Sequence, residues 1–218
     1  MDYQPLFGEL EKHANPFIAL QMSAYMRNLF PFLGIKAPQL NDLCKPFLKE
    51  YVTNNPVDWD FVFTCWQKPY REAQYVAVRY LENVAPRLKA NDMSSLGELI
   101  VTKSWWDTVD ALSKVVGVLV MRYPQHAATM IEWSCNDNFW IRRVAILHQL
   151  MYKEKTDTVI LEQILTNNWG TNEFFIDKAI GWILRQYSKT NPDWVRRFIF
   201  EHKTKMSKLT IREGSKYI

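Results

Sequence analysis

Apolar residues recur at helical spacing along most of the chain, in segments of helix length that Pro and Asn residues interrupt. In the first fifty residues the pattern predicts three helices. A turn at 31–34 lies between the second and the third, and a break at 54–56 ends the third. No run of alternating β-branched residues requires a sheet, so the sequence predicts an all-α fold. The three expected helices cover 7–14, 17–28 and 39–50.

From residue 59 onward the chain repeats itself. Ala77, Ala111 and Ala145 stand 34 residues apart, and Ile180 follows 35 residues later in a matching segment. A period in the thirties with helix-length segments is typical of an α-solenoid, in which stacked helix pairs bury each other's apolar faces. We therefore expect a curved array whose concave face is lined by one helix of each pair. Such faces bind other macromolecules, and a protein-binding scaffold is one possibility. The repeated helices cover 70–80, 105–112, 139–147 and 174–182. A helix over 59–65 precedes them, and the alternate helices of the pairs cover 96–102, 123–133 and 159–167.

One repeat departs from the others at the position before the repeated small or aliphatic residue. It has Asp110 there, where the other repeats have Val76, Val144 and Ala179. An apolar residue there indicates packing, and a carboxylate in such a column is unfavourable unless it is hydrogen-bonded or functional. Asp110 also lies four residues after Trp106, so the two share one helix face. An aromatic face beside a carboxylate suits a cationic ligand. The plainer alternative is a core Trp with a surface Asp.

Positive charge is concentrated in the C-terminal part of the chain. The net charge is +4, yet residues 139–218 hold 14 Lys and Arg against 8 Asp and Glu, a net of +6. Such a field attracts polyanions. Arg142 and Arg143 lie on one repeated helix, and Lys178, Trp182 and Arg185 lie on the next. The alternative interpretation is a solvated helical surface, with one of the two arginines solvated and the other ion-paired, and with Trp182 in the core.

Several other classes of function lack support in the sequence. Cys44, Cys65 and Cys135 are far apart without a paired motif, which suggests reduced thiols in a cytosolic protein. The four histidines are scattered, so we expect no metal site, and no Gly-rich phosphate loop is present. No apolar run is long enough to span a membrane, and the N-terminus does not look like a signal peptide.

Four segments together resemble the AlkD-type alkylpurine DNA glycosylases, a HEAT-like repeat family of DNA alkylation repair proteins. The resemblance covers most of the chain and implies a single HEAT-like repeat domain over 1–218. Its concave face would bind double-stranded DNA. The most specific segments are 25–35, 103–110, 140–147 and 174–182.

The resemblance also implies an activity and a site. Such enzymes excise N3- and N7-alkylated purines, such as 3-methyladenine and 7-methylguanine, by hydrolysing the N-glycosidic bond without extruding the base into a pocket. By this resemblance Asp110 is the catalytic carboxylate and Trp106 and Trp182 contact the lesion. Arg143, with Arg142 beside it, contacts DNA phosphate, and Tyr25 faces the same site.

We accordingly expect a monofunctional glycosylase without metal or organic cofactor, acting as a monomer in the cytoplasm on the nucleoid. Met151 stands where some members of the family have a basic residue, which bears on the strength of DNA binding. The rival hypothesis is a non-catalytic HEAT-like module that binds DNA or protein.

Overall fold

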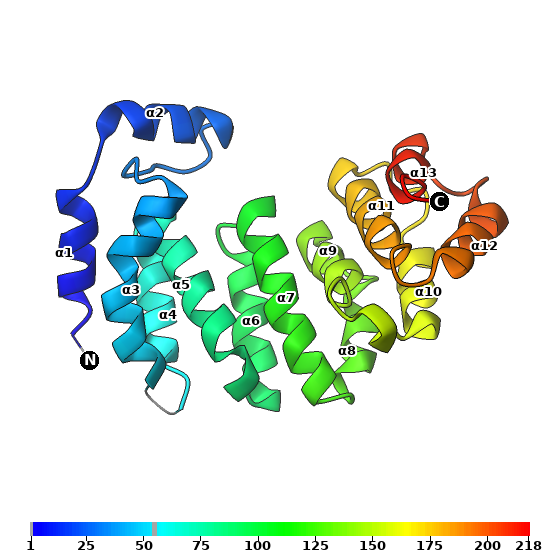
Figure 1. Ribbon diagram of the computed structural model, residues 1–218, viewed down its shortest axis with the longest axis horizontal. Helices are drawn as coiled ribbons and strands as arrows, with labels where there is room; N and C mark the ends of the chain where they lie inside the picture. The colour runs from blue at the N-terminus through cyan, green and yellow to red at the C-terminus, as the bar shows by residue number, and fades with distance from the viewer. Residues whose placement is uncertain (1, 54–55) are drawn as a thin grey trace. The chain divides into compact units, whose positions relative to one another are not determined.

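A computed structural model describes residues 2–53 and 56–218, and this part of the chain is helical without any strand (Figure 1). The described part contains thirteen α-helices and three short 3-10 helices. The all-α prediction is confirmed, and the succession of helix pairs is that of an α-solenoid-like repeat. No helix within these residues is long and apolar enough to cross a membrane.

The contacts of the chain divide it into two compact units, Met1–Leu88 and Lys89–Ile218. The first unit holds five α-helices, of which α3 and α5 pack against each other and α4 packs against α5. The single domain and the concave face expected from the sequence stay predictions. The helices of the first unit are α1 (Gln4–Lys12), α2 (Pro16–Tyr25), α3 (Ala37–Thr53), α4 (Trp59–Gln67) and α5 (Arg71–Val84).

A buried carboxylate fixes the loop after α2. Glu72, at the start of α5, is fully buried and accepts hydrogen bonds from the backbone N–H groups of Leu33, Gly34 and Ile35 at 2.9, 2.8 and 3.1 Å. Gly34 has a φ of +92°, and a Cβ there would lie 2.1 Å from the carbonyl oxygen of Asn15. Only glycine therefore fits, and the loop lies close against the start of α2.

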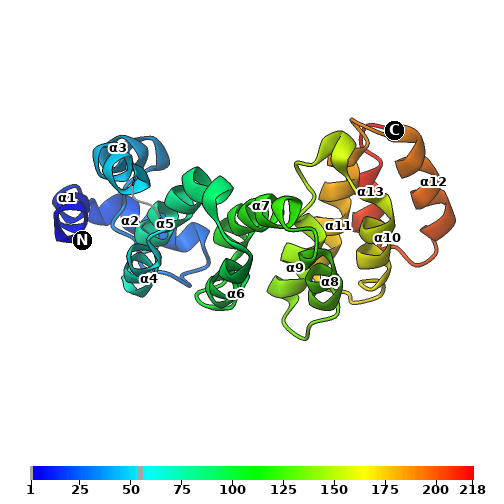
Figure 2. The same ribbon diagram turned by 90° about the horizontal axis from the view of Figure 1, so that it is seen from below.

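The second unit continues the repeat as four helix pairs. Its odd-numbered helices form a row in which α7 contacts α9, α9 contacts α11, and α11 contacts α13 (Figures 1 and 2). The helices are α6 (Met93–Val101), α7 (Trp106–Arg122), α8 (His126–Trp133), α9 (Phe139–Leu147), α10 (Thr158–Thr166), α11 (Phe174–Tyr187), α12 (Pro192–His202) and α13 (Lys208–Gly214).

The expected helices are all present among the described residues, most of them with shifted ends. Helix α9 has the expected bounds, because the Asn138 side chain caps its N-terminus by accepting from the backbone N–H of Trp140 at 2.9 Å. Helix α3 runs through Pro46 to Thr53, so the proline does not end it. The expected break at 54–56 lies partly outside the described residues. The sequence pattern does not predict helices α12 and α13.

The repeat column behaves as packing. Val76, Val144 and Ala179 are buried, with exposed fractions of 1%, 0% and 0%, whereas the Asp110 side chain keeps 15%. The Asp at this position is therefore an exception in three dimensions as well as in sequence.

Candidate active site

The first turns of α7 place Trp106 and Asp110 on one helix face. Trp105 is the N-cap in an extended conformation, and Ser104 Oγ donates to the Ile100 carbonyl at 2.6 Å. Thr108 Oγ1 donates back to the Trp105 carbonyl at 3.4 Å. These bonds start the helix at Trp106, so Asp110 follows one turn later.

Asp110 is held by a two-pronged ion pair with Arg143 on the neighbouring helix α9. Arg143 Nε donates to Oδ1 at 2.7 Å and Nη2 donates to Oδ2 at 2.9 Å. The third guanidinium nitrogen, Nη1, donates to the Phe175 carbonyl at the start of α11. The Arg143 side chain is only 4% exposed. Through these hydrogen bonds it links its own helix, α9, to α7 and α11.

Burial raises the pKa of Asp110, and its cationic neighbours oppose that rise. Desolvation is the largest influence on this pKa, while the hydrogen bonds and charge of Arg143 lower it. The charge of Asp107 raises the Asp110 pKa further, and Lys114 lowers it. Arg143 therefore favours the ionised form of a carboxyl group that burial alone would tend to neutralise.

Asp110 lies in the wall of a hollow of about 290 Å³ formed by α7, α9 and α11. Four residues singled out in the sequence meet here, since Trp106, Asp110, Arg143 and Trp182 all line it. Aromatic and cationic side chains supply most of the remaining wall, so the hollow joins ring faces to charges of both signs. The other lining residues are Phe174, Phe175, Lys178 and Arg185.

A carboxylate from α13 pairs with both cations on α11. Glu213 accepts from Lys178 Nζ at 3.0 Å and from Arg185 Nη1 at 2.7 Å. These hydrogen bonds and charges, led by Lys178, lower the pKa of Glu213. The close approach of α13 depends on Gly181, because a Cβ at this position would lie 2.5 Å from the Glu213 Cβ. No sequence pattern points to Glu213, since it lies outside the recognised repeats.

An aromatic cluster packs beside the ion pair. Phe175 contacts Trp105, Trp140 and Phe139 at ring-centroid distances of 5.2, 4.8 and 6.1 Å. Trp140 and Phe175, like Trp106, each stand five residues before the repeated small or aliphatic position. Their packing joins α9 to α11 and so fixes the helices that carry Arg143 and Trp182.

The remaining predicted site residues do not line this hollow. Arg142 Nη1 donates to the carbonyls of Asn136 and Asp137 at 2.8 and 3.4 Å, at the loop before α9. Tyr25 is 73% exposed and lines a separate hollow in the first unit, so its role at the site stays a prediction. Phosphate contacts by Arg142 and Arg143 also stay predictions. Met151 is 57% exposed.

Potential metal ligands and thiols are spread out among the described residues. Within residues 2–53 and 56–218, no three His, Cys, Asp or Glu side chains gather in a way that could hold a metal ion. The three cysteines are free; Cys44 and Cys65 are buried and Cys135 is exposed. The side chains that line the hollow include the Asp110 carboxylate, aromatic rings and cations.

Comparisons with known proteins place the chain in a family. The model of the DNA alkylation repair enzyme family matches residues 7–218, and the chain belongs to this family. Its members' role in alkylation repair makes DNA the expected substrate. A search of curated proteins finds no significant match.

Two solved structures are similar to this one. The first is described as a predicted DNA alkylation repair enzyme from Enterococcus faecalis. It is 41% identical with a TM-score of 0.87, and the match covers 94% of this chain and 96% of the other. The second, smu.31 from Streptococcus mutans UA159, has a TM-score of 0.61 over 82% of this chain and 97% of its own. At 17% identity, it shows a shared fold only.

Proposed function

We propose that this protein is a DNA glycosylase that hydrolyses the N-glycosidic bond of positively charged N3- and N7-alkylated purines in duplex DNA. The observation that carries the proposal is the Asp110 carboxylate, paired with Arg143 in the wall of an aromatic hollow. Membership of the alkylation repair family supports the same conclusion.

The substrate needs little acid catalysis. An alkylated purine carries a formal positive charge, and it becomes neutral when the C1′–N bond breaks and the bonding electrons go to the base. The sugar is left with oxocarbenium character, which a nearby carboxylate stabilises. Water then forms the new bond to C1′, and its proton passes to Asp110 and on to solvent.

Arg143 is the positioning residue for this carboxylate. It uses one lone pair of each Asp110 oxygen, so further acceptor positions stay available to the sugar and water. Its charge also favours the ionised carboxylate, the form that both steps require.

Trp106 and Trp182 supply the surface for the lesion. Their rings line the same hollow as Asp110, and ring faces favour a cationic nucleotide by up to ~2 kcal/mol when desolvated. Lys178 and Arg185 line the same hollow, and their positive charges would attract the phosphates beside the damaged nucleotide. Because the hollow is an open surface feature, it supports attack on the backbone side without extrusion of the base.

The test is incubation with duplex DNA that contains one 7-methylguanine, with 3-methyladenine as a second substrate. We expect free base and a matching number of abasic sites, in proportion to enzyme and time. Asp107→Asn is a matched control, because it removes a carboxylate three residues from Asp110 on the same helix. Binding without base release would refute the glycosylase and leave the non-catalytic DNA-binding module.

A further inference from the structure

We propose that the exposed face of α12 docks an acidic peptide segment of a partner protein, with a large apolar side chain of that peptide against Phe200. The face consists of the exposed side chains of α12 and of Lys203 directly after it. Helix α12 packs against α11 and α13 (Figure 1) but contributes no residue to the candidate active site. The proposal does not depend on the proposed function.

Phe200 stands on the side of α12 that faces away from the core. Trp194, Val195 and Phe198 are buried on the opposite side of the helix, with exposed fractions of 8%, 0% and 2%. Phe200 by contrast is 71% exposed. Contact with an apolar group of a partner would remove this ring from water. A single exposed apolar residue is ordinary on a protein surface, so the residues around Phe200 decide whether it marks a site.

Three cations surround the Phe200 ring. Arg196 and Arg197 precede it by four and three residues, so helix geometry puts them on its side of α12, and Lys203 follows it by three. All three are exposed. Lys203 Nζ lies 5.0 Å from the centroid of the Phe200 ring. An exposed ring among positive charges is complementary to an apolar side chain flanked by carboxylates.

The other even-numbered helices of the second unit do not share this pattern. As the structure describes them, α6, α8 and α10 contain no Lys or Arg, and each contains one Glu. Among the described residues of these helices and α12, Phe200 is the only exposed aromatic side chain. Departures from an otherwise consistent pattern concentrate at functional sites. The basic and aromatic face is therefore a special feature of α12 and not of the repeat.

The composition of the face favours a peptide over a phosphate backbone. Asp193 is 90% exposed and accepts from Arg196 at 2.8 Å, and Glu201 next to Phe200 is exposed as well. These carboxylates would repel a continuous row of phosphates, whereas a peptide can place its own carboxylates at the cations alone. Aromatic residues and Arg are also the side chains enriched at protein–protein interfaces.

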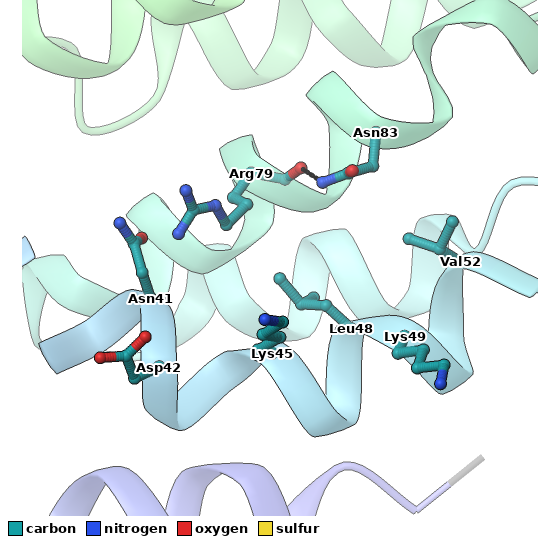
Figure 3. A pocket seen from close by; sticks show the side chains of 8 residues that line it. All are labelled: Asn41, Asp42, Lys45, Leu48, Lys49, Val52, Arg79 and Asn83. Carbon is teal, nitrogen blue, oxygen red and sulfur yellow. Dashed lines mark hydrogen bonds between the residues drawn. The ribbon is translucent and has the colours of Figure 1, made fainter. Parts of the chain in front are cut away.

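A second basic surface of the chain shows the contrast. In the first unit, Lys45, Lys49 and Arg79 line a groove of about 390 Å³ between α3 and α5 (Figure 3). None of the described residues that line this groove is aromatic. Cations without an aromatic residue among them suit the DNA-binding role that the family resemblance implies. The α12 face differs because an exposed ring lies among its cations.

The experiment measures binding of a fluorescein-labelled peptide to the full chain by fluorescence anisotropy. The peptide has a central Phe between two runs of Asp. We expect saturable binding that weakens as salt rises, because exposed charges are screened. Phe200→Ala should weaken binding by about 10-fold or more, as the loss of a central aromatic contact does. Arg197→Glu should also weaken binding by about 10-fold, because it places a like charge against the peptide.

Matched variants on other helices test whether these effects belong to α12. Phe17→Ala removes an equally exposed Phe, at 71%, from α2, and Lys12→Glu reverses a 75% exposed cation on α1. Both should bind the peptide like the wild type. Replacing the Phe of the peptide by Ala should weaken binding to the wild type but have little further effect on Phe200→Ala, because the two rings share one contact. The exposed position of Phe200 should leave the melting temperature of Phe200→Ala unchanged.

Three results would overturn the proposal. The first is a wild type without saturable peptide binding, or a Phe200→Ala variant with wild-type affinity. The second is displacement of the bound peptide by undamaged duplex DNA at equal ionic strength, because the face would then belong to a DNA-binding surface. The third is self-association in sedimentation that Phe200→Ala abolishes, because a second copy of this chain would then occupy the face. None of these measurements uses base release, so a failure here leaves the proposed glycosylase untouched.

Discussion

Asp110→Asn tests two roles of one carboxylate: the ion pair with Arg143, and the catalytic role proposed for it. Asn keeps the size of the side chain but removes its charge and basicity. It also presents an amide NH₂ to one of the two Arg143 nitrogens that now donate to the carboxylate. The variant should therefore lose activity and some stability together.

The stability cost follows from the ion pair. Hydrogen bonds to charged groups contribute roughly 1.5–3 kcal/mol. In the variant, the buried Arg143 keeps the introduced amide oxygen as one acceptor and the Phe175 carbonyl as another, so we expect a loss of about 2 kcal/mol. For a chain of this length, that corresponds to a fall in melting temperature of roughly 4–8 °C.

The effect on the rate should be larger. Loss of a general base or of a charge that stabilises the transition state lowers rates by about 10²–10⁴-fold. A fall of at least ~100-fold in single-turnover release of 7-methylguanine, about 2.7 kcal/mol, is expected at a temperature where both proteins are folded. DNA affinity should hold or rise slightly, because a carboxylate that repels phosphate is gone.

Two controls separate chemistry from structure. Asp107→Asn should keep base release within a few-fold of the wild type. Arg143→Lys loosens the pair but keeps the Asp110 carboxylate, so its rate should fall less than that of Asp110→Asn. A folded Asp110→Asn protein that releases base at the wild-type rate would remove Asp110 from the mechanism.

Three further predictions concern the surroundings of the site. Because burial raises the Asp110 pKa, base release should be lost as pH falls through a midpoint above 3.8. Arg143→Met should move that midpoint to higher pH in a rate–pH profile, because Arg143 lowers the Asp110 pKa. An unmoved midpoint would contradict the assignment of this midpoint to Asp110. Glu213, whose pKa is lowered in the folded state, contributes stability above its unfolded pKa that is lost as pH falls through the folded pKa. The melting temperature of Glu213→Gln should therefore approach that of the wild type in acid, and a constant gap would refute this. Gly181→Ala should cost about 1–3 kcal/mol in denaturant unfolding, because its Cβ would meet the Glu213 Cβ at 2.5 Å; an unchanged midpoint would show that α13 can shift.

The helical repeat is predictable because it depends on spacing. Ala77, Ala145 and Ile180 are buried at equivalent positions of their repeats, so the period of the repeat can be seen in the sequence. Helix ends are less predictable, since they depend on capping bonds and on packing. Pro46 favours a break by local propensity, yet α3 continues past it while Leu48 and Tyr51 are buried.

The site is predictable where it breaks the repeat. Asp110 stands out because its column is otherwise apolar, and Trp106 follows from helix geometry. The ion pair with Arg143 cannot be deduced, because the two residues lie 33 positions apart and their meeting depends on how α7 packs on α9. The family resemblance assigns Arg143 to the phosphates, whereas its guanidinium is bonded to Asp110 and Phe175.

The pairing of Asp110 with Arg143 explains how a repeat scaffold can hold a carboxylate in a packing column. An apolar residue at this position fills space, as Val144 does in the next repeat. A carboxylate there needs compensation for lost hydration, and Arg143 provides it from the column next to that of Val144. The guanidinium fixes the carboxylate from the protein side and leaves its other lone pairs toward the hollow. The regular positions of the repeat thus supply the packed frame, and Asp110 and Arg143 on adjacent helices form the ion pair that marks the candidate site.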